Sequence, residues 1–96
     1  MSTVTFVKHW TDEVGSIGAV VRFSLDMPRV PVKGETLSIG PWNQRIDEVT
    51  FSVSAVGECH HHVHVECFMT EIVTSREMLT SLRDSFKQVL KEFNIP

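Results

Sequence analysis

The sequence predicts a small α+β domain: a five-stranded, strongly curved antiparallel sheet, or a small partly open barrel of the SH3-like or OB-like kind, with one C-terminal amphipathic helix packed on it. The chain has 96 residues, which suits a single domain, since domains usually hold about 100 to 150 residues. Five stretches alternate apolar and polar residues with the period of a strand, and the last stretch has the apolar period of a helix. Because each element has one apolar face, the helix and the sheet should cover each other.

The first two predicted strands cover residues 3–10 and 17–25. In the first strand, Val4 and Phe6 fall on one face, because successive side chains of a strand point to opposite faces. The second strand has the clearer apolar face, formed by Ile17, Ala19, Val21, Phe23 and Leu25. Arg22 falls on its opposite face, which we expect to be the outer face of the sheet.

A connection over residues 26–34 follows and leads into a short predicted strand at residues 35–39. Pro28 and Pro31 interrupt any regular element in this connection. A Gly-Pro pair then forms a turn after the short strand, and we expect Trp42 to lie at its tip.

Residues 25–37, Leu-Asp-Met-Pro-Arg-Val-Pro-Val-Lys-Gly-Glu-Thr-Leu, resemble a hairpin of many small phage and bacterial accessory proteins of uncharacterised function. In those proteins, a connection with prolines and then Gly-Glu or Gly-Asp joins two strands of a small β domain. The likeness is centred on residues 28–35 and covers residues 17–53. It implies a phage-type or mobile-element accessory protein, and it implies no catalytic residue, since the residues that carry it form turns.

The last two predicted strands, at residues 46–56 and 60–72, pair antiparallel around a turn at Gly57 and Glu58. The fourth strand has an apolar face that we expect to point into the core, formed by Val49, Phe51, Val53 and Ala55. Hydroxyl side chains alternate with these residues on the outer face.

The helix is predicted over residues 75–93. Thr74 and Glu77 have the spacing of a capping box, in which each side chain binds a free backbone N–H of the first turn. One broad apolar face follows, formed by Met78, Leu79, Leu82, Phe86, Val89, Leu90 and Phe93. Asn94 and Pro96 are typical of the end of a helix.

Charge and hydropathy argue against two classes of partner. Nine basic and twelve acidic side chains give a net charge of −3, whereas nucleic-acid binding favours a basic surface. No stretch approaches the ~20 apolar residues of a membrane span, so we expect no membrane contact. The five histidines make the charge dependent on pH, since all of them protonated would change −3 to +2.

Cys59 and Cys67 are the two cysteines. On one extended strand their Cα atoms would lie roughly 26 Å apart, at ~3.3 Å per residue, which is far beyond the ~7 Å limit of a disulfide. We therefore expect two free, buried thiols, as in a protein of the reducing cytoplasm of a producing or infected cell.

The least usual feature is the histidine-rich strand at residues 60–72. Its core face should carry Cys59, His61, Val63, Val65, Cys67 and Met69. Its outer face should carry His60, His62, His64 and Glu66. Imidazole and carboxylate groups in this spacing suit zinc or nickel, so these four residues are candidate metal ligands. The alternatives are a protein interface in which His62 contacts a partner, and a solvated outer face.

Two loops and one helix face are further candidate sites. Trp42 on its turn, and Arg29 and Pro31 on the proline-containing connection, are candidate partner contacts together with Arg22, because large aromatic and arginine side chains are enriched at binding hot spots. A basic stripe on the helix could bind an anion or nucleotide, or be a solvated face; it is formed by Arg76, Arg83, Lys87 and Lys91.

These observations favour a small, non-enzymatic protein-protein interaction module that works as a homodimer. Together with the resemblance, they suggest a phage or mobile-element accessory or inhibitor protein that binds a host protein. The alternatives are a metal-binding protein that uses the histidine strand, and a small-ligand or nucleotide-binding protein. The chain has no Gly-x-Ser-x-Gly, phosphate-binding glycine loop or His-Glu-x-x-His motif, and we therefore predict no catalytic residue.

Overall fold

The computed structural model describes residues 2–12, 18–55, 61–74 and 76–95. Six strands and one helix follow each other in the order β1 (Ser2–Thr11), β2 (Gly18–Met27), β3 (Thr36–Ile39), β4 (Trp42–Arg45), β5 (Glu48–Ala55), β6 (His61–Ile72) and α1 (Arg76–Glu92). The predicted α+β class with one C-terminal helix is confirmed. The predicted five-stranded sheet is wrong, because the strands of the described residues form two sheets, and these do not close into a barrel.

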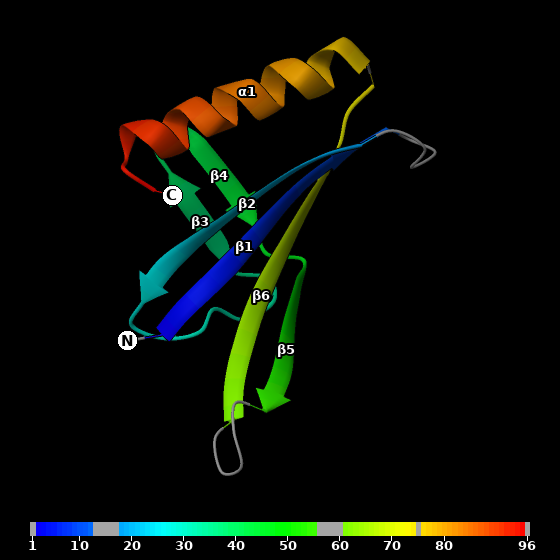
Figure 1. Cartoon of the computed structure of the whole chain (residues 1–96). Coiled ribbons are helices and arrows are strands. Elements are labelled where there is room, and N and C mark those ends of the chain that lie inside the picture. Colours follow the sequence, from blue (N-terminus) through cyan, green and yellow to red (C-terminus); the bar gives the residue numbers. More distant parts are fainter. Residues whose placement is uncertain (1, 13–17, 56–60, 75, 96) are drawn as a thin grey trace.

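The larger sheet has four strands in the order β2-β1-β6-β5 (Figure 1). β1 pairs antiparallel with β2, and β5 pairs antiparallel with β6. The two hairpins are joined by β1 and β6, which run parallel from the Thr5–Glu66 pair to the Thr11–Ile72 pair. The prediction of a wholly antiparallel sheet is therefore wrong at its centre. Alternation along the chain determines which face of a strand is apolar, but it does not determine the direction of its neighbour.

β3 and β4 form a separate two-stranded antiparallel sheet. The second of these strands was not expected, since Trp42 was predicted at a loop tip and instead begins β4, opposite Ile39. The inward positions of β4 are Trp42 and Gln44, which are half-buried, while Asn43 and Arg45 are exposed. A glutamine on the inward face concealed the apolar-polar alternation that identifies a strand.

The core lies between the larger sheet, the β3–β4 sheet and α1. Its centre is a cluster of aromatic rings in which Phe86 of α1 contacts Trp10, Phe23 and Trp42 at centroid distances of 5.3 to 5.6 Å. Figure 1 shows that α1 lies over the β2 side of the sheet, away from β5. The other buried residues of α1 are Leu79, Val89 and Leu90, as its apolar period predicts. Met78 and Phe93, near the two ends of the predicted apolar face, are exposed.

The C-terminus of α1 has the hydrogen bonds of a Schellman motif. Asn94 has a φ of 55°, its N–H donates to the carbonyl of Lys91, and the N–H of Ile95 donates to the carbonyl of Leu90. The predicted helix stop at Asn94 is thereby confirmed, because asparagine tolerates the left-handed conformation better than most residues. Ile95 also packs against the core.

Residues 28–35 connect β2 of the larger sheet to β3 of the smaller one. The two strands do not pair with each other, so the segment that resembles a hairpin is a crossover between sheets. The glycine of its Gly-Glu pair, Gly34, has a φ of 94°, which other residues rarely adopt. The turn chemistry was predicted correctly, whereas the pairing of the flanking strands was not.

Candidate functional site

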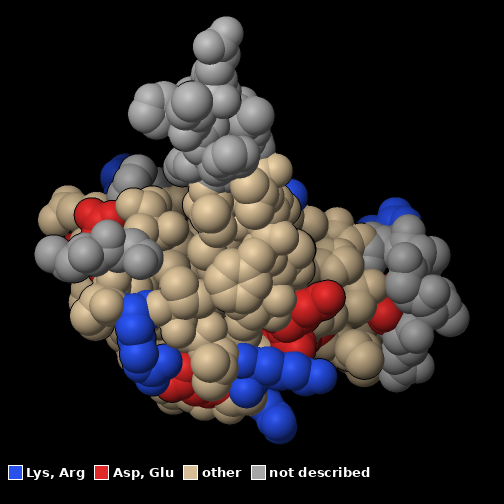
Figure 2. Space-filling model, turned by 90° about the horizontal axis from the view of Figure 1, so that it is seen from below, with Lys and Arg blue, Asp and Glu red and all other residues tan. Residues whose placement is uncertain are grey.

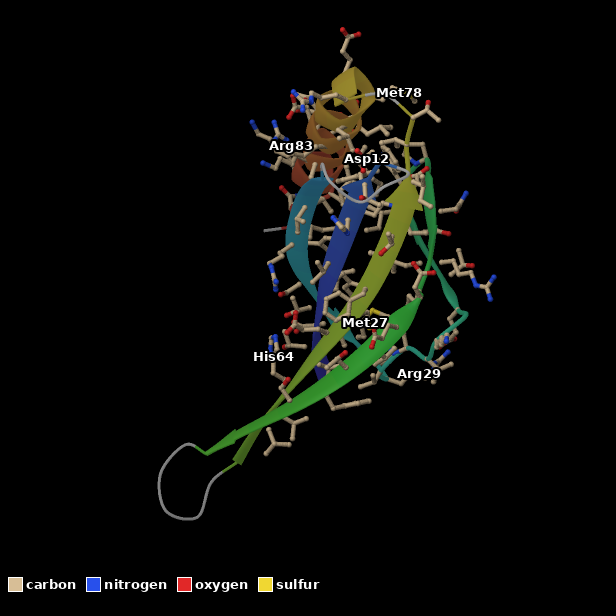
Figure 3. The ribbon with its side chains drawn as sticks, turned by 90° about the vertical axis from the view of Figure 1, so that its right-hand side faces the viewer. Asp12, Met27, Arg29, His64, Met78 and Arg83 are labelled. Atoms are coloured by element: carbon tan, nitrogen blue, oxygen red, sulfur yellow. The ribbon has the colours of Figure 1, made fainter. Side chains whose placement is uncertain are left out.

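β5 and β6 extend together past the start of β1, away from the helix and from the β3–β4 sheet (Figures 1 and 3). We call this extension the arm and define it as residues 51–55 of β5 paired with residues 61–65 of β6. The register opposes Phe51 to Val65, Ser52 to His64, and Val53 to Val63. The predicted antiparallel pairing of the last two strands is therefore confirmed, with serine and histidine positions facing each other on the outer side.

The core-side face of the arm is apolar and open to solvent. Phe51, Val53 and Val63 are 58%, 64% and 53% exposed. Phe51 and Val53 lie on the predicted, core-side face of β5, but they are exposed and not buried in the core as predicted. The core ends at Val65, which is buried, and at Val49, which is half-buried against it, because α1 lies over the β2 side of the sheet and does not extend over the arm. The largest contiguous apolar patch on the surface of a protein is often functional, so the arm is a candidate contact surface.

An open groove of about 650 Å³ lies where the arm meets the start of β1. Phe51, Val63 and Val65 of the arm contribute apolar walls to it, and Val30 of the β2–β3 connection lies against it as well. Thr3 and Thr5 of β1 contribute hydroxyl groups. The exposed face of the arm therefore continues into a groove that is lined by both apolar and hydroxyl side chains.

The outer face of the sheet carries a small charged cluster. The Arg22 guanidinium of β2 reaches across β1 to Glu66 of β6, with Nη1 and Oε2 3.1 Å apart. Nε2 of His64 lies 3.6 Å from the other carboxylate oxygen of Glu66. Figure 3 shows His64 on the side of the sheet opposite to Arg29. Arg22 and His64 thus lie on the outer face as predicted, and Arg22 uses its charge within the chain.

The metal-ligand prediction is only partly covered by the structure. His60 lies outside the described residues, and so does the side chain of His62, whose position is defined by its pairing with Ser54 alone. His64 and Glu66 lie on one face, as the two-residue spacing requires. The described residues contain no group of three histidine, cysteine or acidic side chains that could hold a metal ion. Zinc or nickel binding by this strand stays a prediction.

Trp42 and Pro31, two of the predicted partner contacts, pack against the protein itself. The Trp42 ring makes edge contacts with Trp10 at 6.3 Å and with Phe86 at 5.3 Å, and it is half-buried. Pro31 is buried. Neither residue is presented at the tip of a loop, so the structure offers no protruding anchor at these positions.

Arg29, the third loop residue, is exposed and held by an ion pair. Its guanidinium binds both carboxylate oxygens of Glu35, one at 2.8 Å, and Glu35 also accepts the N–H of Val32 at 2.7 Å. The side-chain hydrogen bond from Arg29 lowers the pKa of Glu35 to about 2, and the Val32 bond adds to this. A small hollow of about 240 Å³ beside the pair is lined partly by Pro28 and Pro31. The pair fixes the connection, and Arg29 is not free to bind an anion with both nitrogens.

The predicted basic stripe lies on the solvent side of α1. Arg76, Lys87 and Lys91 are exposed, and Arg83 is half-buried beside Asp84, with Nε and Oδ1 3.3 Å apart. None of the described grooves is lined by these four side chains. Their arrangement is that of a solvated helix face, and anion or nucleotide binding there stays a prediction.

Sequence reasoning overlooked Lys8, which is 1% exposed on the core face of β1. Its ammonium group donates to Oε1 of Gln44, lies 3.3 Å from Oε2 of Glu71, and sits 5.4 Å from the centre of the Trp10 ring. Burial lowers the pKa of Lys8, and the Glu71 carboxylate acts in the opposite direction. The alternation Val4, Phe6, Lys8, Trp10 was sufficient to place it on the core face.

Glu71 also accepts the indole N–H of Trp10 at 3.1 Å, so one carboxylate binds two core side chains. Every buried polar side-chain atom of the described residues has a partner. The Lys8 cluster therefore stabilises the contact between the larger sheet and β4. Lys8 lines none of the three described grooves, and its contacts with Gln44 and Glu71 hold its ammonium group in place.

Cys67 is fully buried in the core, as predicted, and burial raises the pKa of its thiol. A raised pKa disfavours the thiolate, which is the nucleophilic form. Cys59 lies outside the described residues.

Comparison with protein families, with curated proteins and with solved structures finds no match to this chain. Within the described part of the chain, no helix has the length and apolar character needed to cross a membrane.

Proposed function

We propose that this chain is a protein-protein interaction module that binds its partner through the arm, and that it acts by binding rather than by catalysis. The observation that carries the proposal is the apolar face of Phe51, Val53 and Val63 on paired strands beyond the core. More than half of the surface of each residue is exposed, and burial of apolar surface yields about 25 cal/mol per Å². A protein surface is the ordinary partner for such a patch.

The charge distribution supports a protein partner of apolar character. From Val49 to Val65 the sequence contains a single charged side chain, Glu58, and otherwise hydroxyl, apolar and histidine residues. Figure 2, which views the molecule from below, shows a centre without lysine, arginine, aspartate or glutamate, and charged side chains gathered toward its borders. An uncharged centre with a charged rim is the usual anatomy of a protein interface.

The Cys67 thiol and the Lys8 ammonium group, both in the described core, also support a function in binding rather than in catalysis. Cys67 is buried with a raised thiol pKa, and Lys8 is bound to Gln44 and Glu71. Neither group lines any of the three described grooves.

A photo-crosslinking amino acid placed at Val53 tests the proposal in cells that express the full chain. Irradiation should convert a fraction of the chain into a covalent adduct of higher mass, and mass spectrometry then identifies what is attached. The same residue placed at Thr80, on the exposed side of α1, is the matched control and should give little adduct. Equal, low yields at both positions would contradict the proposed function, whatever the partner.

A further inference from the structure

The outer edge of β5 differs from the edge that β2 forms on the other side of the larger sheet. In the order β2-β1-β6-β5, β2 and β5 are the edge strands of the described residues, and residues 61–65 of β6, which precede its pairing with β1, leave a further open edge. β2 carries Arg22 and Asp26, and charged side chains on an edge strand oppose pairing with another chain. β5 carries no charge after Glu48, its first residue. Figure 1 shows neither α1 nor the β3–β4 sheet beside the free edge of β5.

An uncharged open edge is a template for one further strand, whose backbone N–H and C=O groups pair with those of the edge. The added strand must be extended, must lack charge opposite residues 49–55, and must put apolar side chains on the core-side face and polar ones on the outer face. β5 itself meets these three requirements. It places Phe51 and Val53 on the core-side face and Ser52 on the outer face.

We propose, on the basis of the interaction function above, that the partner of the arm is a second copy of this chain, and that the two β5 strands pair antiparallel about a two-fold axis at Ser52. This register puts Ser52 opposite Ser52 of the second copy, and Phe51 opposite Val53 of the second copy on both sides of the axis. An aromatic residue opposite a β-branched one is a favourable cross-strand pair. The axis stands perpendicular to the sheet, so the apolar faces of both copies lie on the same side of a continuous eight-stranded sheet, twice the four strands of one copy.

Size and charge indicate a reversible dimer. Seven paired residues and two pairs of apolar side chains bury less than the ~1,200 Å² of a standard interface, so we expect association that depends on concentration. No like charges oppose each other within residues 49–55, so the two-fold arrangement meets no electrostatic penalty there.

Sedimentation velocity of the purified full chain across a range of concentrations tests this. The mass of the wild type should rise from 10.9 kDa toward twice that value. Ser52→Lys and Ser52→Glu each put like charges opposite each other at the axis, and each should weaken association at least tenfold. An equimolar mixture of the two variants should restore the dimer, because lysine then faces glutamate. Val20→Lys, at an exposed position of the β2 edge, is the control and should associate as the wild type does.

Ser52 is exposed, so its variants should fold, and thermal unfolding of each variant verifies this. A wild type that stays monomeric at the highest concentration would overturn the inference. So would single variants that still dimerise, since the copies would then meet through another surface, and so would a mixture that fails to recover. The crosslinking experiment separates the two proposals: an adduct with a different protein, together with a monomeric purified chain, would remove the dimer and retain the interaction function.

Discussion

At the scale of single residues, the main finding is that the buried positions of β1 and β6 include two titratable groups, Lys8 and Cys67, whose pKa values burial shifts in opposite directions. Lys8 has a pKa lowered from 10.5, chiefly by burial, and Cys67 has a pKa raised from 9.0 by burial. Both shifts disfavour the charged form, and they act on stability in opposite directions. For Lys8, the unfolded chain holds the proton to higher pH than the folded one, so stability rises with pH up to 10.5. For Cys67, the unfolded chain loses its proton first, so stability falls as pH rises beyond 9.0.

We therefore predict that Lys8→Met and Cys67→Ala change the pH dependence of stability in opposite ways. Without Lys8, only the destabilising contribution of the thiol remains, and the free energy of unfolding should fall more steeply than in the wild type as pH rises beyond 9.0. Without Cys67, it should rise or stay level. Urea unfolding at several pH values measures both slopes, and comparing slopes removes the constant cost of the cavity that the alanine leaves. Parallel curves for the wild type and both variants would contradict this account.

At the scale of elements, the end of α1 shows how one residue ends a helix. Asn94 adopts the left-handed conformation, and its neighbour Ile95 closes the motif on Leu90. A residue with a Cβ and no short polar side chain pays about 1 to 2 kcal/mol in this conformation. Asn94→Ala should therefore destabilise the chain by about 1 kcal/mol, whereas Asn94→Gly should leave it as stable or slightly more so. Thermal unfolding distinguishes the two, and equal losses in both variants would mean that the asparagine side chain itself, rather than the backbone, matters.

The connection between β2 and β3 should depend on acid through its ion pair. Glu35 has its pKa lowered to about 2 from 4.5 by Arg29 and the Val32 N–H. A lowered carboxyl pKa contributes stability above 4.5, which is lost as pH falls from 4.5 toward 2. Glu35→Gln and Arg29→Gln should both reduce the pH dependence in this window, and the double variant should add little to either, because both disrupt one interaction. Full additivity in urea unfolding at acidic pH would show that the two side chains act separately.

The elements that alternation could predict are those whose burial depends on one face alone. β2 and the apolar face of α1 agree with the sequence because Val21, Phe23, Phe86 and Leu90 contact the core directly. β4 could not be predicted, since its inward Gln44 is explained only by Lys8, which is 36 residues away in the chain. The parallel pairing of β1 and β6 depends on contacts between segments that are far apart in the chain, which no local pattern records.

The histidine pattern predicts a site on the outer face of the last predicted strand, and this site stays a prediction. The exposed apolar residues Phe51, Val53 and Val63 lie on the opposite face of the same strand pair, which the sequence assigned to the core. Phe51 and Val53 were assigned to the core because they alternate as core residues do. Alternation shows which side of a strand is apolar, but burial also requires another element above it, and the position of the single helix decided that.

At the scale of the whole molecule, the elongated shape results from the position of α1, which covers only part of the larger sheet. The Cα radius of gyration is 14.8 Å, and a compact chain of this length would have about 12.5 Å. The longest dimension is 49 Å, against 30 and 23 Å for the other two. β1 is paired on both sides from Thr5 to Thr11, over the core. In the arm, residues 61–65 of β6 pair with β5 alone, and the apolar face is uncovered at Phe51, Val53 and Val63.

This shape predicts unequal stability along one sheet, and hydrogen exchange measures it. β1 lies between β2 and β6 and over the core, so its backbone amides should exchange only when the whole domain unfolds. The backbone amides near Val53 and Val63 should exchange much faster in dilute solution. Raising the protein concentration should slow exchange in the arm and leave β1 unchanged, because association adds a partner to the free edge of β5 alone. The Ser52→Lys variant should lose this concentration dependence while keeping the protection of β1. If the arm were already as protected as β1 in dilute wild type, its apolar face would have cover within the single chain, and neither the interaction surface nor the dimer would be needed to explain it.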